Sequence, residues 1–177
     1  RRQRQMCIRD RHRNAKIAVE VTCDIKPAIY TESSLFFHLP VAENGNRSLS
    51  DQEENDGKGG WTDQGTDDMS VLEPGQIIAQ GIPFRIGEKA IILRGKFRQA
   101  FPAESMALPV GLKVDRLAFC HTAAWCPQGS AAFFYRIVYQ NGKVIDVPVI
   151  GGVDVGDWAS PNNKVKTAWK GNNGQHA

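Results

Sequence analysis

The sequence predicts an all-β protein, built as an antiparallel β-sandwich. Short apolar segments recur along the chain, and each is bounded by turn residues. Seventeen glycines and nine prolines supply those turns. Helical periodicity never extends beyond about one turn, and no run approaches the ~18 apolar residues of a membrane span. The 177 residues are enough for one domain with its own core.

The first thirteen residues carry the basic character of the chain. They hold six arginines and one aspartate, a local charge of +5, so the total of +3 leaves −2 for residues 14–177. Basic arms are typical of nucleic-acid binding. However, the codons CGT CGG CAG CGT CAG ATG TGT ATA AGA GAC, from a transposase adapter of sequencing libraries, encode RRQRQMCIRD. Residues 1–11 therefore resemble a translated adapter. We treat 1–13 as a non-native arm, expect no nucleic-acid partner, and keep a disordered nucleic-acid arm as the alternative.

The elements follow in chain order. AKIAVEVT, residues 15–22, alternates as a strand does, within a linker or preceding-domain end at 14–33. The module itself is expected over 34–177. It opens with a strand at 35–42, ending at Pro40, and continues into a long exposed loop at 43–60.

The middle of the chain predicts three further strands. Residues 75–87 form one that bends at Gly81 and Pro83, and KAIILRG, 89–95, forms a core strand. Residues 115–125 form a strand that places Leu117, Phe119 and His121 on one face.

The clearest local pattern is AAFFYRIVYQ-NG-KVIDVPVI, residues 131–150. Asn141-Gly142 between strand-like flanks predicts a hairpin with a type I′ turn. Residues 165–171 form a last strand. Because the chain ends at 177 with no element to cover that strand, we expect that C-terminal strands of the sandwich are missing.

The cysteines and histidines of the chain limit which disulfides and metal sites it can form. Outside the arm, Cys120 and Cys126 are either buried thiols or a disulfide across a short loop, and Cys23 is left over. Of the four histidines, His12 adjoins the adapter and His176 lies at the chain end, which leaves His38 and His121. With no CxxC pair either, a catalytic zinc site is not expected. Nucleophile elbows, P-loops and dinucleotide fingerprints are absent from the sequence.

GGWTDQGTDD is the segment richest in binding chemistry. Trp61 offers an aromatic face for the C–H side of a sugar ring, and Asp63 and Gln64 offer groups for its hydroxyls. Alternatively, Trp61 is core and the two polar residues satisfy buried backbone. Four aspartates could also bind a structural calcium ion or form a solvated acidic loop: Asp56, Asp63, Asp67 and Asp68.

Two later segments add candidates. His121 and Trp125 lie at a strand end and in the following loop, where ligands of sandwich proteins bind. Asp157 and Trp158 adjoin another polar loop. Tryptophan is usually core, so at most one or two of the four are expected to line a site.

Several motifs in fixed order resemble a known module. They are DGKGGWTDQGTDD, GIPFRIG, IILRGK, PVGLKVDRLAFCHTAAW, YRIVYQNGKVIDVPV and GDWASP with VKTAWKG. Together, over about residues 34–173, they are similar to the galactose-binding-like accessory modules of bacterial glycoside hydrolases and polysaccharide-degrading proteins. The resemblance implies a jelly-roll sandwich, a non-catalytic role and a secreted or periplasmic host. Ala159 departs from the pattern, since relatives often carry a second aromatic there.

We therefore expect a carbohydrate-binding or carbohydrate-enzyme-associated module. Its partners would be a polysaccharide and other domains of the same polypeptide. The expected sugar contacts are Trp61, Asp63, Gln64, His121, Trp125, Asp157 and Trp158. A purely structural interdomain module is one alternative. Another is part of a glycoside hydrolase catalytic unit, which needs two carboxyls about 5–5.5 or 6.5–9.5 Å apart; Asp63 and Asp157 are the pair considered.

Overall fold

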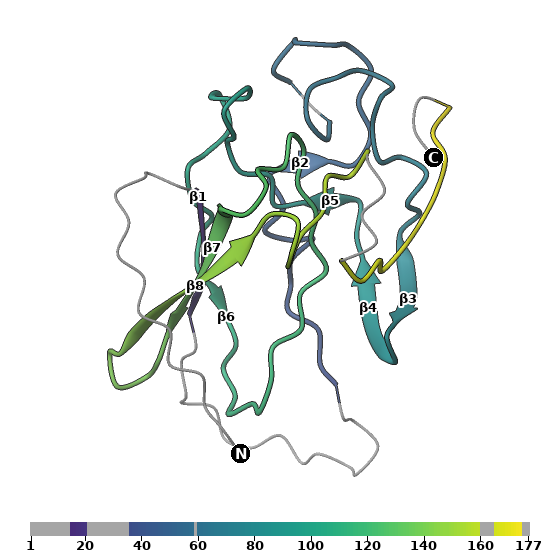
Figure 1. Cartoon of the computed structure of the whole chain (residues 1–177). Helices are drawn as coiled ribbons and strands as arrows, with labels where there is room; N and C mark the ends of the chain where they lie inside the picture. The colour runs from purple at the N-terminus through teal and green to yellow at the C-terminus, as the bar shows by residue number, and fades with distance from the viewer. Residues whose placement is uncertain (1–14, 21–35, 59, 160–164, 175–177) are drawn as a thin grey trace.

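The computed structural model describes residues 15–20, 36–58, 60–159 and 165–174 (Figure 1). The strands are β1 Ala15–Glu20, β2 Arg47–Ser48, β3 Gly75–Ala79, β4 Ile82–Ile86, β5 Lys89–Ala90, β6 Leu108–Pro109, β7 Ala131–Val138 and β8 Val144–Ile150. Our expectations for the arm, for Cys23 and the connection around it, and for the loop at 160–164 lie outside the described residues.

The all-β prediction is confirmed for this part of the chain, which contains strands, bridges and turns and no helix. Correspondingly, no helix that could cross a bilayer occurs among the described residues. The largest sheet has the order β6-β1-β7-β8, and β2-β5 and β3-β4 form two-stranded sheets. Pairing in the large sheet is mixed rather than purely antiparallel, because β1 runs parallel to both β6 and β7.

The hairpin predicted at 131–150 is confirmed as β7 and β8, but its turn type is not. Of the two turn residues only Gly142 has a positive φ, of 80°, whereas a type I′ turn needs both. The Gly142 N–H donates to the Tyr139 carbonyl, and the Tyr139 N–H donates to that of Lys143. This is a type I turn closed by a glycine bulge.

The segment at 75–87 forms a hairpin rather than one bent strand. β3 pairs antiparallel with β4 from Gly75 opposite Ile86 to Ala79 opposite Ile82. The turn residues Gln80 and Gly81 have φ values of 54° and 76°. Two successive positive φ values are the signature of a type I′ turn, so that geometry occurs here. The hairpin was missed because Gln-Gly is a weaker turn signal than Asn-Gly.

Three predicted strands do not form. Residues 36–42 have no ladder partner, because the chain turns at Pro40, whose carbonyl accepts from the Asn44 backbone and side-chain N–H groups. Segments 115–125 and 165–171 also contain no strand, and in the first of them only Ala123 pairs, in an isolated bridge with Asp157. In the first of them, Leu117, Phe119 and His121 are nevertheless partly buried while Ala118 and Cys120 are exposed. The predicted face is therefore present on an irregular extended chain.

Two other segments are more ordered or less ordered than predicted. The loop at 43–60 contains β2 and buries Leu49, so it is only partly exposed. The core strand predicted at 89–95 shrinks to β5, although Ile92 remains buried. Asn46 explains why the strand is so short. Its side chain donates to the Ile92 carbonyl and accepts from the Ile92 N–H, and so takes the place of a neighbouring strand.

Two small hydrophobic clusters stabilise the described part of the chain. One contains Trp61, Ile92 and Phe101, and the other Tyr135, Val149 and Val155. Figure 1 shows the β3–β4 hairpin and the β7–β8 hairpin on opposite sides of the molecule. Most of the predicted site residues lie in two loops, one between β2 and β3 and the other between β6 and β7.

Candidate functional site

Two of the tryptophans predicted to contact sugar are part of the core. Trp61 is only 7% exposed and packs against Ile92 and Phe101. Trp158 packs on the same cluster, with its ring centroid 5.8 Å from that of Trp61 and the planes at 70°. An edge-to-face pair of this kind stabilises a core. The buried Trp61 ring therefore cannot serve as an open platform, which corrects the prediction for Trp61, whereas Trp158 is only partly buried.

Asp63 and Gln64 are engaged within their own loop. Asp63 is 8% exposed, and its Oδ1 accepts a hydrogen bond from the Gly57 N–H at 3.2 Å. Its backbone is in the left-handed region at φ 61°, which aspartate tolerates better than most residues. The Gln64 side-chain oxygen accepts from the Thr62 hydroxyl. Asp63 thus satisfies a backbone donor, as our structural alternative expected, whereas Gln64 bonds to a side-chain hydroxyl of the same turn.

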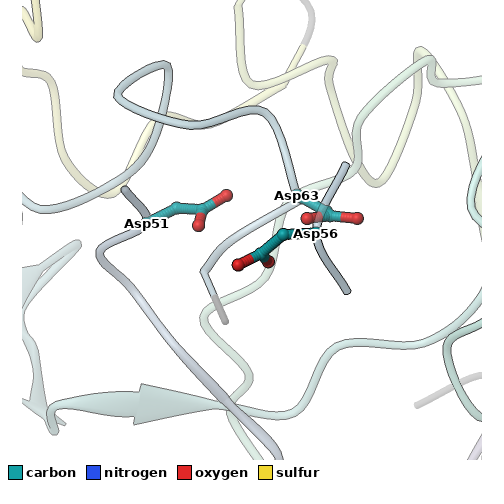
Figure 2. Close-up of side chains that lie close together, drawn as sticks. All are labelled: Asp51, Asp56 and Asp63. Carbon is teal, nitrogen blue, oxygen red and sulfur yellow. The ribbon is translucent and has the colours of Figure 1, made fainter. Parts of the chain in front are cut away.

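Asp63 also belongs to a cluster of three carboxylates, with Asp51 and Asp56. One oxygen of each lies within 4.8 Å of the others. Figure 2 shows the three side chains converging from separate points of the loop. Gly60 makes this approach possible, because a Cβ at Gly60 would lie 2.0 Å from the Cβ of Asp51.

Each of these carboxylates already accepts a backbone hydrogen bond. Asp51 accepts from Gly65 and Gln52, and the Asp56 Oδ1 accepts from the Lys58 N–H. Lys58 also places its Nζ 3.6 Å from Asp56. Three carboxylate oxygens at this spacing are a donor set that fits a hard divalent cation such as calcium. The acidic-loop alternative is equally consistent with these contacts, which offset the charge repulsion without a metal.

Only two of the four aspartates considered for calcium join this cluster. Asp68 is buried, and it accepts from the backbone N–H groups of Asp51 and Ser70. Asp67 accepts from the Asn173 side chain, 106 residues further along the chain. These two residues tie the loop to its surroundings.

Trp125 differs from the other predicted tryptophans because it is exposed. Its side chain is 43% exposed, and the ring centroid of Phe97, which is 54% exposed, lies 5.4 Å away. The Arg98 guanidinium carbon lies 5.3 Å from the centre of the Trp125 ring. The Lys96 Nζ lies 5.3 Å from the centre of the Phe97 ring. Two aromatic rings and two cations thus form an open surface, which we call the Trp125 patch: Lys96, Phe97, Arg98 and Trp125.

The backbone holds Trp125 in an unusual conformation. Its φ is 52°, which is uncommon for a bulky residue and costs on the order of 1 kcal/mol or more. On one side, the Ala123 carbonyl accepts from the Trp158 N–H at 2.9 Å. On the other, the Cys126 N–H donates to the Asp157 Oδ2 at 2.9 Å. These contacts fix the segment that presents the exposed ring.

Arg98 connects the Trp125 patch to the GWTDQG turn. Its Nε donates to the Thr62 carbonyl at 2.6 Å and its Nη2 to the Asp63 carbonyl at 3.2 Å. Sequence reasoning missed Arg98 and Phe97. The signal was present in RGKFRQ, where an aromatic residue stands between two cations in a segment with no other large apolar side chain.

His121 packs beside the second core cluster, on the rings of Tyr135 and Phe133. Its Nδ1 is 2.7 Å from the Tyr135 hydroxyl and its Nε2 is 3.1 Å from the Asp154 carbonyl. Its ring also packs edge-on against Phe133. Burial, and then the neighbouring Cys120 thiol, raise the pKa of Tyr135 well above its usual 10.0. The structural reading of His121 as a hydrogen-bonded core histidine therefore fits its contacts.

Asp157 and the cysteines also have structural contacts. Asp157 accepts hydrogen bonds from the N–H groups of Cys126 and Ala159. The carboxylates that converge with Asp63 are those of Asp51 and Asp56. Cys120 and Cys126 are free thiols, and the disulfide alternative is not realised. Burial raises the pKa of the half-buried Cys126 thiol.

The predicted residues thus fall into three groups. Trp61 and Trp158 pack together. Asp63 and Gln64 make hydrogen bonds within the neighbouring turn, which Arg98 joins to Trp125. His121 contacts Tyr135 beside the other cluster. Comparison with protein-family models, curated proteins and solved structures finds no match.

Proposed function

We propose that this chain is a non-catalytic carbohydrate-binding module whose platform is the exposed ring of Trp125. One observation carries the proposal. Trp125 is held open to solvent at φ 52°, beside Phe97 and Arg98, while Trp61 is buried in the core and Trp158 is partly buried against it. Backbone strain at an exposed aromatic residue points to function, because packing alone gives no reason to keep it.

The chemistry of the patch suits a sugar ring. The C–H face of a pyranose packs on an aromatic face, and hydroxyl groups accept from guanidinium donors. Phe97 and Trp125 are tilted by 58°, so each ring would contact a different face or a different residue of the glycan. The contact area is small and open, and binding at one such site is expected to be weak.

We further propose that the sheets belong to a jelly-roll sandwich of an accessory module in a secreted or periplasmic polysaccharide-processing protein. The order of sequence motifs supports this, as do the antiparallel pairs β2–β5, β3–β4 and β7–β8. Other domains of the same polypeptide would be its partners.

Affinity electrophoresis of the whole chain in gels containing soluble polysaccharides tests the binding proposal. Trp125→Asn removes the ring while supplying a residue that tolerates φ 52°. We expect this variant to lose about tenfold in affinity, as for an aromatic anchor, with an unchanged melting temperature. The matched control is Tyr139→Asn, which removes another exposed aromatic side chain. Equal retardation of both variants would overturn the assignment of Trp125.

A specific observation also favours the structural interdomain alternative. Large apolar side chains are exposed away from the Trp125 patch, including Ile78 at 71% and Met106 at 76%. An open hollow of 2980 Å³ also runs through the described part of the molecule, which exceeds the ~300–1,000 Å³ of ordinary ligand pockets. A covering neighbour domain would bury these surfaces. If no polysaccharide retards the folded protein, this alternative replaces binding.

A further inference from the structure

The Trp125 patch carries positive charge as well as aromatic surface. The Lys96 Nζ lies 5.3 Å from the centre of the Phe97 ring, and the Arg98 guanidinium lies 5.3 Å from that of Trp125. Each exposed aromatic ring is therefore accompanied by its own cation, at a distance typical of a cation–π contact.

Neither cation is neutralised within the part of the chain that the structure describes. The ion pairs found there are Lys58 with Asp56 and Arg136 with Asp146. The Arg98 Nε and Nη2 donate to the carbonyls of Thr62 and Asp63. Its Nη1 has no partner among the residues that the structure describes. A guanidinium anchored on one side through backbone carbonyls presents its remaining donors in a fixed direction.

We infer that the Trp125 patch recognises an acidic glycan, one that bears uronate or sulfate groups. This inference rests on the proposed carbohydrate-binding function and adds the substrate class. The sugar ring packs on Trp125 or Phe97, and its anionic group lies between the Lys96 ammonium and the free edge of Arg98. Guanidinium-to-carboxylate and guanidinium-to-sulfate hydrogen bonds are charge-assisted and stronger than those to neutral hydroxyls.

The geometry also explains why Arg98 occupies this position rather than Lys. The Nε and Nη2 of one planar group donate to the carbonyls of the GWTDQG turn and leave Nη1 without a partner among the described residues. An ammonium has all its donors on one nitrogen and cannot reproduce this spacing. We therefore expect Arg98→Lys to lose affinity for an acidic glycan although it keeps the charge.

Affinity electrophoresis can distinguish this inference from the proposed function. The whole chain is run in gels containing a neutral glucan, a polyuronate or a sulfated galactan, at low and at raised salt. All runs are repeated in a background where the six arginines of residues 1–13 are glutamine, because that segment would itself retain a polyanion. Single-stranded oligothymidylate serves as the nucleic-acid probe, since aromatic and cationic groups also bind it.

We expect retardation by the polyuronate or the sulfated galactan, weakened by salt, in both backgrounds. Lys96→Gln should lower the affinity about threefold, as for an exposed charged contact, whereas Lys143→Gln, an equally exposed lysine on the β7–β8 turn, should not change it.

Three results would overturn the inference. Salt-independent binding of the neutral glucan with equal affinity would remove the acidic class and leave the carbohydrate-binding function intact. Oligothymidylate binding as tight as that of any glycan would replace the glycan with nucleic acid. No retardation by any polysaccharide, from protein shown to be folded, would remove both the function and the class.

Discussion

At the scale of single residues, Asp157 acts on Trp125 through the neighbouring Cys126. It accepts the N–H groups of Cys126 and Ala159, and Cys126 directly follows the strained Trp125. This makes Asp157 a positioning residue for the exposed ring, in contrast to the direct sugar contact expected from the sequence.

Asp157→Ala should therefore weaken both folding and binding. Leaving two N–H groups without an acceptor should lower the free energy of unfolding by about 1–2 kcal/mol, and retardation by glycan should fall in parallel. Chemical denaturation and affinity electrophoresis measure the two effects. Asp146→Ala, which breaks an exposed ion pair with Arg136, should cost less than about 1 kcal/mol and leave binding intact. Lost affinity at unchanged stability would instead identify Asp157 as a direct contact.

Tyr135 gives a second prediction, for alkaline pH. Its pKa is raised in the folded state, first by burial and then by Cys120, so the folded protein favours the neutral phenol. The unfolded chain loses this proton near the usual 10.0. The stability that Tyr135 contributes is thus fully present below pH 10 and falls as the pH rises above it.

Tyr135→Phe separates the two roles of the hydroxyl. Below pH 10 the variant should be less stable by about 1 kcal/mol, because His121 loses its hydrogen bond. Above pH 10 the difference should shrink, since phenylalanine does not ionise. Thermal unfolding at several pH values measures this. Tyr139→Phe, at an exposed position, is the control and should follow the parent chain. A constant difference across the range would contradict the account.

At the scale of elements, the β8 strand combines an open edge with two protective features. In the described part of the chain β7 is its partner and its other edge is unpaired. The ladder starts from the Tyr139–Lys143 hydrogen bond, so Pro148, opposite Phe134, falls at a position where the nitrogen faces away from β7. Proline has no N–H to offer a further strand, and the Ile150 N–H is occupied by the Asp154 Oδ2 at 2.9 Å.

A free N–H group at position 148 and another at Ile150 should allow the β8 edge to pair with a strand of a second molecule. The double variant Pro148→Thr with Asp154→Ala should self-associate more than the parent chain, in proportion to concentration, because two donors become available for a foreign strand. Light scattering coupled to size-exclusion chromatography measures it. Each single variant exposes one donor and should have a smaller effect. An unchanged elution profile for the double variant would show that the edge is covered in another way.

Local patterns predicted elements well where pairing partners are adjacent in sequence. β1 and the β7–β8 hairpin were anticipated, because alternation and a glycine turn specify them locally. Segments 36–42 and 115–125 also have strand-like composition but form no strand in the structure, and only tertiary context decides that. The parallel pairing of β1 with β7, across more than a hundred residues, has no local signal at all.

At the scale of the whole molecule, residue type predicted candidates but not exposure. The same tryptophan chemistry is buried at position 61 and exposed at position 125. That difference depends on how Ile92 and Phe101 fold over one ring while Asp157 holds the segment of the other open. Arg98 acquires its role only because the fold brings it to the carbonyls of Thr62 and Asp63.

The central claim is that Trp125 is the aromatic platform for a glycan, and tryptophan fluorescence tests it most directly. The intact chain is titrated with the glycan that retards it most in gels, and the emission and its quenching by acrylamide are recorded. We predict that the glycan changes the emission and protects it from the quencher, and that both effects vanish in Trp125→Asn. If the same changes persist in that variant, a tryptophan other than Trp125 meets the sugar and the account is contradicted.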